Sequence, residues 1–373
     1  MKTVIVTDGQ YRMALSAVRQ FHALGFHTVV ISDPSMPPLA SRSRSCREAF
    51  FAPAGEETVA LILELCQRYP RPLLFPVGLA TLTACCRRKG ELETLCRCLL
   101  PTTQVLEQAG DKRQVRAAAQ ALGIPVPQAF SPEEGETETQ FFDRVPLPAV
   151  VKFREGEKLG LPAAQRYAIV HTKEALEEAY RRFAAIQKEP LVQAYVNGEA
   201  RGVCVVMDGQ SRPVSLLCHR RLQQYPLSGG PSCRCETVWD EKAQRLAAQS
   251  TALLTHLGFT GIAMVEFKGD HLLEINPRIW GSFPLTAAAE SDFCAVWAQA
   301  ASGSKLETCE SPRCRNGVKM QFFLSDLRAY LAAKRPWACL LHLFTHRQAL
   351  FSLRDLRGTW AYAQSLLKRR FGA

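Results

Sequence analysis

The first third of the chain alternates short β-branched runs with amphipathic stretches, and this alternation constrains the fold more than any other feature of the sequence. The runs at 3–7, 27–31 and 73–76 predict strands, and the stretches at 13–24 and 59–66 predict helices between them. Gly25 follows the first stretch, where a residue without a Cβ can end a helix without strain. Because parallel strands need helical crossovers, these units predict an α/β domain with a doubly wound parallel sheet.

The turn after the first predicted strand, Asp8-Gly9, has only one of the glycines that a dinucleotide-binding loop needs. Without the spacing G-x-G-x-x-G, the sequence does not support dinucleotide binding at this turn.

The positive charge of the chain is concentrated near its end. Of a net charge of +11, residues 320–373 hold nine basic and two acidic residues, so the rest of the chain is close to neutral. A nucleic-acid-binding surface is therefore not expected. The basic segment has two interpretations: a helical subdomain with a solvated basic face, or a surface that contacts an anionic membrane or an acidic partner through its aromatic residues, which are Trp337, Phe344, Trp360 and Phe371.

Fourteen cysteines occur without a Cys-x-x-Cys pair, a composition that favours reduced thiols over a structural zinc site. We find no export signal and no run of eighteen apolar residues. The sequence therefore predicts a cytoplasmic protein without a membrane span, and a homodimer is the common state of such enzymes.

Beyond residue 105 the pattern becomes mixed. Helices are predicted at 111–122, 174–183 and 241–257, and strands at 148–153, 191–196 and 202–207. The segment 261–276 predicts a β-hairpin, and the chain after Pro312 is helical and basic.

The hairpin window holds the clearest chemistry. Glu274 and Asn276 are two residues apart and therefore share a face of their strand. A three-residue turn at 269–271 would place Glu266 opposite Glu274, whereas a two-residue turn would place the two carboxylates on opposite faces. In the first register two carboxylates and an amide oxygen converge, and such a set favours a hard cation such as Mg²⁺. The alternative is a surface hairpin with solvated acids.

This window resembles the ATP-grasp superfamily, whose nucleotide site ends with an acid on one strand and an E-x-N-x-R pattern on the next. Here these are Glu266 and the run Glu274-Ile275-Asn276-Pro277-Arg278. The continuation at 280–293 resembles predicted ATP-dependent carboxylate–amine ligases, which are similar to biotin carboxylase and carbamoyl-phosphate synthetase. The resemblance covers roughly residues 1–300.

The resemblance implies a domain order. A Rossmann-like pre-ATP-grasp domain would occupy residues 1–105, and a two-lobed ATP-grasp domain 106–305. Its small lobe would lie at about 125–195 and its large lobe at about 196–305. A helical basic segment, 306–373, would follow.

The resemblance also assigns roles to single residues. Lys112 and Lys152 correspond to lysines that reach the ATP phosphates. Mg²⁺ or Mn²⁺ would lie on Glu266, Glu274 and Asn276, and Arg278 with the lysines would neutralise charge on the transferred group.

The strand 191–196 corresponds to the hinge between the lobes. The backbone of Ala194 and Val196 would pair with adenine, with Gln193 and Tyr195 in the same strand, and Glu199 would bind the ribose hydroxyls. Arg220 and Arg221 are adjacent, so one of them faces the site whichever way their strand is turned, and that arginine would grip a carboxylate or phosphate.

The implied reaction is ATP-dependent: a carboxylate becomes an acyl phosphate, an amine displaces phosphate, and ADP is released. Both substrates would be small molecules, and no Ser-His or Cys-His nucleophile is needed. Two alternatives stay open, a bicarbonate-activating carboxylase and a nucleotide-binding regulator without turnover. The second draws on a departure from the family, because the loop 153–162 has two glycines and two acids where a glycine-rich loop would cover phosphate.

Overall fold

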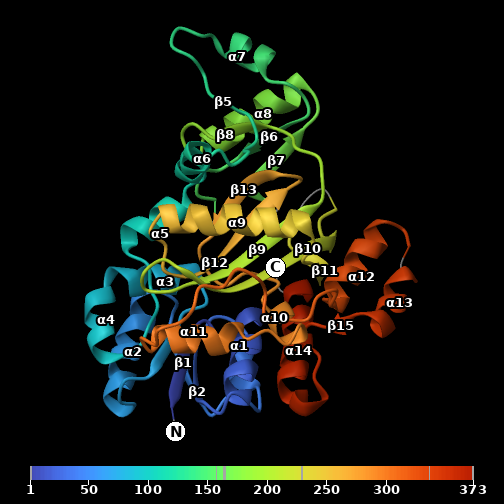
Figure 1. Cartoon of the computed structure of the whole chain (residues 1–373). Coiled ribbons are helices and arrows are strands. Elements are labelled where there is room, and N and C mark those ends of the chain that lie inside the picture. The colour runs from blue at the N-terminus through green and yellow to red at the C-terminus, as the bar shows by residue number, and fades with distance from the viewer. Residues whose placement is uncertain (1, 157, 163–164, 228–229, 336, 372–373) are drawn as a thin grey trace.

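The computed structural model describes residues 2–156, 158–162, 165–227, 230–335 and 337–371. Figure 1 shows its three layers: an N-terminal α/β domain at the bottom, a large lobe in the middle and a small lobe at the top. A parallel α/β domain, two further α+β lobes and a helical C-terminal region confirm the predicted fold class. One loop residue considered above, Glu157, lies outside the described residues.

The N-terminal sheet is parallel throughout, with the strand order β3-β2-β1-β4. Its strands are β1 (Thr3–Val6), β2 (His27–Ser32), β3 (Glu48–Phe51) and β4 (Leu73–Phe75). Val4 and Val6 pack with α1 (Arg12–Ala23) on one face, while Ile5 packs with α2 (Glu56–Arg68) and α3 (Leu79–Arg87) on the other. Helices on both faces make the sheet doubly wound, and α4 (Lys89–Leu95) and α5 (Thr103–Gly110) lead to the next domain.

The small lobe is an antiparallel sheet with the order β5-β8-β6-β7. It consists of β5 (Ala129–Phe130), β6 (Ala149–Lys152), β7 (Tyr167–Val170) and β8 (Leu191–Ala194), with α7 (Glu138–Arg144) and α8 (Lys173–Ala184). Val151 and Val192 pack against the helices. Successive residues along a strand point to opposite faces of the sheet. Lys152, Tyr167 and Gln193 therefore lie on the face away from the helices.

The large lobe is a seven-stranded sheet with the order β13-β12-β9-β10-β11-β14-β15. Its strands are β9 (Ala200–Met207), β10 (Pro213–Gln224), β11 (Ser232–Thr237), β12 (Gly261–Lys268), β13 (His271–Asn276), β14 (Lys319–Gln321) and β15 (Arg347–Gln348). One face is covered by α6 (Lys112–Ala121) and α9 (Glu241–His256). The other face turns toward the N-terminal domain.

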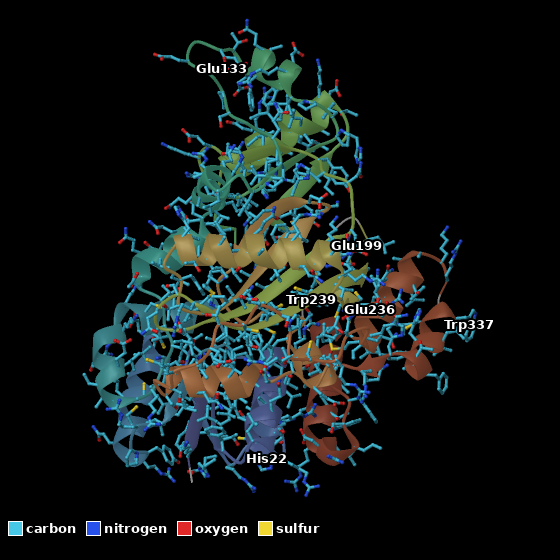
Figure 2. The ribbon with its side chains drawn as sticks, viewed as in Figure 1. His22, Glu133, Glu199, Glu236, Trp239 and Trp337 are labelled. Carbon is cyan, nitrogen blue, oxygen red and sulfur yellow. The ribbon has the colours of Figure 1, made fainter. Side chains whose placement is uncertain are left out.

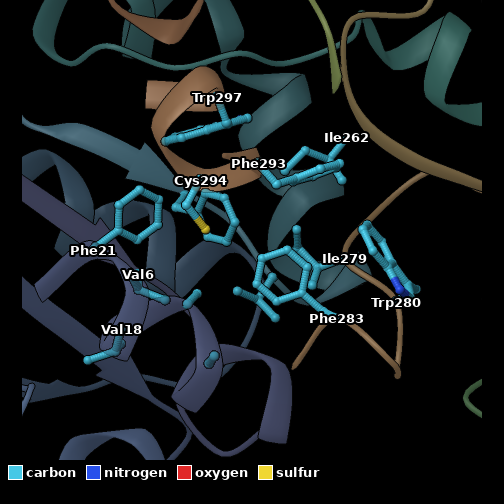
Figure 3. Close-up of a cluster of buried hydrophobic side chains, with 14 of the residues drawn as sticks. Val6, Val18, Phe21, Ile262, Ile279, Trp280, Phe283, Phe293, Cys294 and Trp297 are labelled. Atoms are coloured by element: carbon cyan, nitrogen blue, oxygen red, sulfur yellow. The ribbon is translucent and has the colours of Figure 1, made fainter. Parts of the chain in front are cut away.

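A shared aromatic core joins the large lobe to the N-terminal domain (Figure 3). Phe21 and Phe75 of the N-terminal domain contact Trp297 of α11 (Phe293–Ala301) edge to face. Phe283, beside α10 (Pro284–Ala288), contacts both Phe75 and Trp280. Because this core is continuous, the two domains present a fixed interface to the functional site.

The segment 306–373 contributes strands as well as helices. β14 and β15 extend the large-lobe sheet, with α12 (Phe323–Ala332) and α13 (Ala338–Thr345) between them along the chain. A 3₁₀ turn (Leu353–Asp355) and α14 (Leu356–Phe371) follow β15. Asp355 attaches this segment to the N-terminal domain through Arg19 and Ser43. Within the described ranges, no helix combines the length and the apolar character needed to cross a membrane.

Candidate active site

The two carboxylates of the hairpin, Glu266 and Glu274, face each other because of a register shift and not because of the turn alone. The turn between β12 and β13 has two residues, Gly269 and Asp270, because Lys268 pairs with His271. The register then shifts between Phe267 and Glu266, so that Leu273 is an extra residue on β13 and Glu266 pairs with Glu274. Of the two turns considered above, the two-residue turn forms, and the β-bulge still places the carboxylates opposite each other.

These carboxylates begin a row of residues that crosses the large-lobe sheet. Glu274, Glu266, Gly202 and His219 are successive partners on β13, β12, β9 and β10. Gly202 is needed in this row because a Cβ there would lie 2.6 Å from Nε2 of His219. The glycine therefore lets the imidazole lie directly over the backbone between the strands.

Two basic side chains, one from α6 and one from β10, contact the carboxylates of this row. Lys112 Nζ, at the start of α6, lies 2.9 Å from Glu274 Oε2, and Arg221 NH2 lies 3.5 Å from Glu266 Oε2. Asn276 Nδ2 donates to Glu266 Oε1 over 3.1 Å. The glutamate side chains keep 21% and 31% of their surface exposed, so a small ligand can still reach them.

Lys152 approaches the same carboxylates from the small lobe. Burial and the neighbouring Lys112 lower the pKa of its ammonium group to about 8, although Glu274 and Glu266 oppose the shift. The two lysines thus repel each other across the carboxylates, and a polyanion bound between the lobes would relieve that repulsion.

The two carboxylates differ in their titration. For Glu274, burial opposes ionisation, but Lys112 and Lys152 prevail and hold its pKa at about 2. For Glu266, burial raises the pKa against the pull of Arg221, and the Glu274 charge raises it further. A cation placed between them would favour ionisation of both groups.

The donor set fits a hard divalent cation. Two carboxylates and one amide can supply part of an octahedral shell, and Mg²⁺ usually completes its shell with water and phosphate oxygens. Among the described residues no group of three or more His, Cys, Asp or Glu side chains has the arrangement of a metal site. Arg278, two residues beyond Asn276, donates to the Ile279 carbonyl over 2.6 Å.

The strand 191–196, which the resemblance assigns to the hinge, has side-chain and backbone groups that are buried or already hydrogen-bonded. Gln193 is buried on the Lys152 face of the small lobe. The Ala194 N–H donates to the Gln128 carbonyl over 2.9 Å, and the Tyr195 hydroxyl accepts from Lys268 Nζ over 2.8 Å. Val196 follows where β8 has ended, and adenine pairing at this hinge remains a prediction.

The adjacent arginines of β10 point to opposite faces. Arg221 shares the face of Glu266, while Arg220 is bound on the other face by Glu236 and Glu199, at 2.8 and 3.5 Å. Glu199 also accepts from Arg201 over 2.6 Å, and Figure 2 shows Glu199 and Glu236 near each other on the large lobe. Of the two arginines, the structure therefore brings Arg221 to the carboxylates.

Three residues on the face of the carboxylate row were not singled out by the sequence analysis. The imidazole of His219 is fully buried, its pKa is lowered to about 3 by burial and by Arg221, and its Nδ1 has no hydrogen-bond partner among the described residues. Its Nε2 lies 3.4 Å from the Ser282 hydroxyl. The Nδ1 atom of His219 is thus a buried polar atom without a partner in the described part of the chain, two residues from Arg221.

Arg12 is the third residue, and it comes from the N-terminal domain. Its guanidinium lies 3.9 Å from the centre of the Phe322 ring and close to Gly281. Burial raises the pKa of the Cys235 thiol to about 12, and Arg12 and Arg221 both oppose this rise. Both guanidinium groups therefore lie near β11, on the face of the carboxylate row. Only an expected contact between α1 and the remote strand β11 could have identified Arg12 from the sequence.

The loop after Lys152 carries its own ion pair. Lys158 pairs with Glu155 three residues earlier, and the Arg154 N–H donates to the Gln187 side chain over 2.7 Å. The Lys158 ammonium group is thus neutralised within the loop. Closure over phosphate would need Lys158 to exchange Glu155 for a phosphate oxygen.

Residues 109–282 match the family model described as the ATP-grasp domain. The chain also resembles a biotin carboxylase from Campylobacter jejuni in complex with a nucleotide, with TM-score 0.67, 15% identity, and coverage of 86% of this chain and 74% of that one. The biotin carboxylase domain of Hydrogenobacter thermophilus 2-oxoglutarate carboxylase, a dimer in complex with MgADP, gives TM-score 0.64, 16% identity, and coverage of 86% and 73%. An L-amino acid ligase from Bacillus licheniformis gives TM-score 0.59, 14% identity, and coverage of 81% and 74%.

Proposed function

We propose that this chain, in which residues 109–282 match the model of the ATP-grasp domain, is an ATP- and Mg²⁺-dependent ligase that joins a small carboxylate to an amine. The observation that supports this most is the pairing of Glu266 with Glu274 next to Lys112 and Arg221. Acids for a cation and bases for phosphate occur there together, at the junction of the two lobes.

In the proposed reaction a carboxylate oxygen takes the terminal phosphoryl group of ATP, and an amine nitrogen then displaces phosphate from the carbonyl carbon. Mg²⁺ bound at Glu266, Glu274 and Asn276 would neutralise phosphate oxygens. Lys112 and Lys152 would bind the phosphates from two sides and hold them in line with the carboxylate. Arg278 would neutralise charge on the transferred group.

The carboxylate substrate would lie between β10 and the N-terminal domain. Arg221 and Arg12 offer guanidinium groups from two domains, and a guanidinium can bind a carboxylate through two parallel hydrogen bonds. Arg220, in its pairs with Glu236 and Glu199, would support the sheet and the ribose-binding acid instead of substrate.

The test begins with thermal unfolding in the presence of Mg·ATP, with magnesium alone for comparison. A ligand that binds only the folded state stabilises it by about 2.7 kcal/mol at one hundred times Kd. We expect a metal-dependent rise in Tm that Glu274→Ala abolishes. Asp270→Ala is the matched control, because Asp270 lies in the turn of the same hairpin and pairs with Arg245 over 3.0 Å, away from the carboxylates. A folded protein without a shift at millimolar Mg·ATP would contradict the proposal.

A second step separates the ligase from its alternatives. ADP release is measured with mixtures of carboxylates and amines, and with bicarbonate alone. Release that needs both a carboxylate and an amine supports the ligase, while release with bicarbonate alone indicates a carboxylase. Binding of Mg·ATP without release under any condition indicates a regulator, the alternative that the Lys158–Glu155 pair in the phosphate loop favours.

We also propose a cytoplasmic location. All fourteen cysteines are free thiols, and most of them are buried. A protein that keeps so many reduced thiols fits a reducing compartment.

A further inference from the structure

Helix α13 has its polar side turned inward and its apolar side turned outward. Cys339, His342 and His346, at positions i, i+3 and i+7, share the inner face. His342 Nε2 lies 2.9 Å from Arg234 NH1, its ring stacks on Tyr330, and the Gln321 amide contacts the Cys339 sulfur at 3.3 Å. Hydrogen bonds and a ring stack thus attach the inner face of this helix to the protein.

The outer face of α13 is apolar and uncovered. Trp337, Leu341 and Phe344, at positions i, i+4 and i+7, are 79%, 69% and 91% exposed. Leu340 lies on the same side, and Leu331 at the end of the neighbouring α12 is also exposed. Figure 2 shows Trp337 at the outer edge of the C-terminal helices, far from the rest of the large lobe. We call Leu331, Trp337, Leu340, Leu341 and Phe344 the outer patch.

The charge around the outer patch is positive. Lys334 and Arg335 are exposed in the turn before Trp337, and neither pairs with an acid among the residues that the structure describes. The two acids of residues 320–373 are turned inward: Asp326 is buried against Arg234 at 3.1 Å, and Asp355 is held by Arg19 at 2.8 Å. Within residues 320–373, the exposed charges next to the patch, Lys334 and Arg335, are thus both positive.

We propose that the outer patch binds the surface of an anionic phospholipid bilayer. An aromatic and aliphatic helix face inserts at the boundary between headgroups and acyl chains, and flanking lysine and arginine residues bind the anionic headgroups. Trp337 lies at the edge of the patch, a position in which its ring can span the boundary between water and hydrocarbon.

A second copy of the chain fits this surface less well. A symmetric dimer through the outer patch would bring Lys334 and Arg335 of one protomer near the same residues of its partner, because a two-fold interface repeats the same surface on both sides. Like charges at the rim would repel. An anionic surface supplies the opposite charge instead.

The experiment is co-sedimentation of the full chain with phosphatidylcholine vesicles that contain or lack phosphatidylglycerol, at low and high salt. We expect binding to the phosphatidylglycerol vesicles that weakens as salt rises. The double variant Leu341→Glu/Phe344→Ser should bind at least about tenfold more weakly, because it removes apolar area and adds a negative charge. Lys334→Gln/Arg335→Gln should weaken the binding and reduce its dependence on salt.

The matched control is Phe51→Ser/Ile186→Ser, which removes two exposed apolar side chains from the N-terminal domain and the small lobe. It should bind vesicles as the unaltered chain does. Melting temperatures establish that each variant is folded, and none of these positions lies in the proposed active site. Three results would overturn the proposal: no binding at low salt, equal binding by the outer-patch variant, or a concentration-dependent dimer that Leu341→Glu abolishes. The last result would assign the patch to a second copy.

Discussion

Asp355 and Glu274 are both carboxylates beside basic side chains, but their surroundings differ. Asp355 accepts hydrogen bonds from Arg19 Nε, Ser43 Oγ and the N–H groups of Arg44 and Gly358, at 2.6 to 3.0 Å. Its side chain is almost completely covered. Glu274 meets Lys112, faces a second carboxylate across the hairpin and stays partly exposed.

The difference separates a structural network from a binding site. At Asp355 the strongest acceptor positions are filled by the protein itself, so the network joins the C-terminal segment to the N-terminal domain. At the hairpin, Lys112 and Arg221 pair with the two carboxylates, but the Glu274 charge still raises the pKa of Glu266 and Lys112 still lowers the pKa of Lys152. A complete network stabilises the fold, and an incomplete one is available for a ligand.

The largest effect is expected at the complete network. Asp355→Ala leaves Arg19 and two backbone N–H groups without their buried acceptor, and should lower the free energy of unfolding by about 3–5 kcal/mol. Urea denaturation measures this change. Affinity for Mg·ATP in the folded fraction should not change. A loss below about 1 kcal/mol would mean that the network contributes as little as a surface ion pair.

For Lys152→Met at the hairpin site we expect the opposite result, a loss of Mg·ATP binding without a loss of stability. Removing an ammonium group that burial and Lys112 disfavour should leave the free energy of unfolding unchanged or raise it. Affinity for Mg·ATP should fall by about a hundredfold, because a buried charge contact to phosphate is lost. Calorimetric titration and urea denaturation on the same sample give both values. A Lys152→Met protein that is destabilised but binds Mg·ATP with unchanged affinity would show that Lys152 stabilises the fold and does not bind phosphate.

The pH dependence follows from the lowered pKa of Lys152. Its value in the folded protein, about 8, lies below the ordinary 10.5, so charging Lys152 costs stability below pH 8, and this cost disappears as pH rises from about 8 to 10.5. Mg·ATP binding should have the opposite trend and weaken above about pH 8, by up to tenfold per pH unit. Lys152→Arg, which stays charged, should bind with no such decline. An unchanged decline in that variant would assign the titration to another group.

The smallest effect is expected at Arg12. Arg12→Ala should raise KM for the carboxylate substrate by about tenfold and leave the Kd for Mg·ATP unchanged, because Arg12 lies by β11 and the nucleotide residues lie between the lobes. Steady-state ADP release, with the carboxylate that screening identifies, measures both. Arg12→Lys should recover part of the loss. Equal changes in KM and Kd would instead indicate that Arg12 only fixes the domains through Phe322.

Local sequence signals were sufficient for elements with their own periodicity. Asp111 caps the helix that carries Lys112 by accepting from the N–H groups of Arg113 and Gln114, and the helix was predicted within one residue at each end. The strands of Lys152 and of the hairpin were also found, since alternation over a few residues identifies them. The same short range explains what was missed, such as β3 and the parallel pairing of β14 with β15, whose partners lie far along the chain.

The sequence by itself determined which groups are present and how far apart they lie along each strand. It placed Glu274 and Asn276 on one face, put a lysine at the end of the strand 148–153, and offered two adjacent arginines. Tertiary structure decided which groups meet. A bulge at Leu273 put Glu266 opposite Glu274, the direction of β10 selected Arg221 over Arg220, and domain packing brought Arg12 to β11. Spacing follows from local backbone geometry, whereas register and domain contact depend on the free energy of packing residues that are distant in sequence.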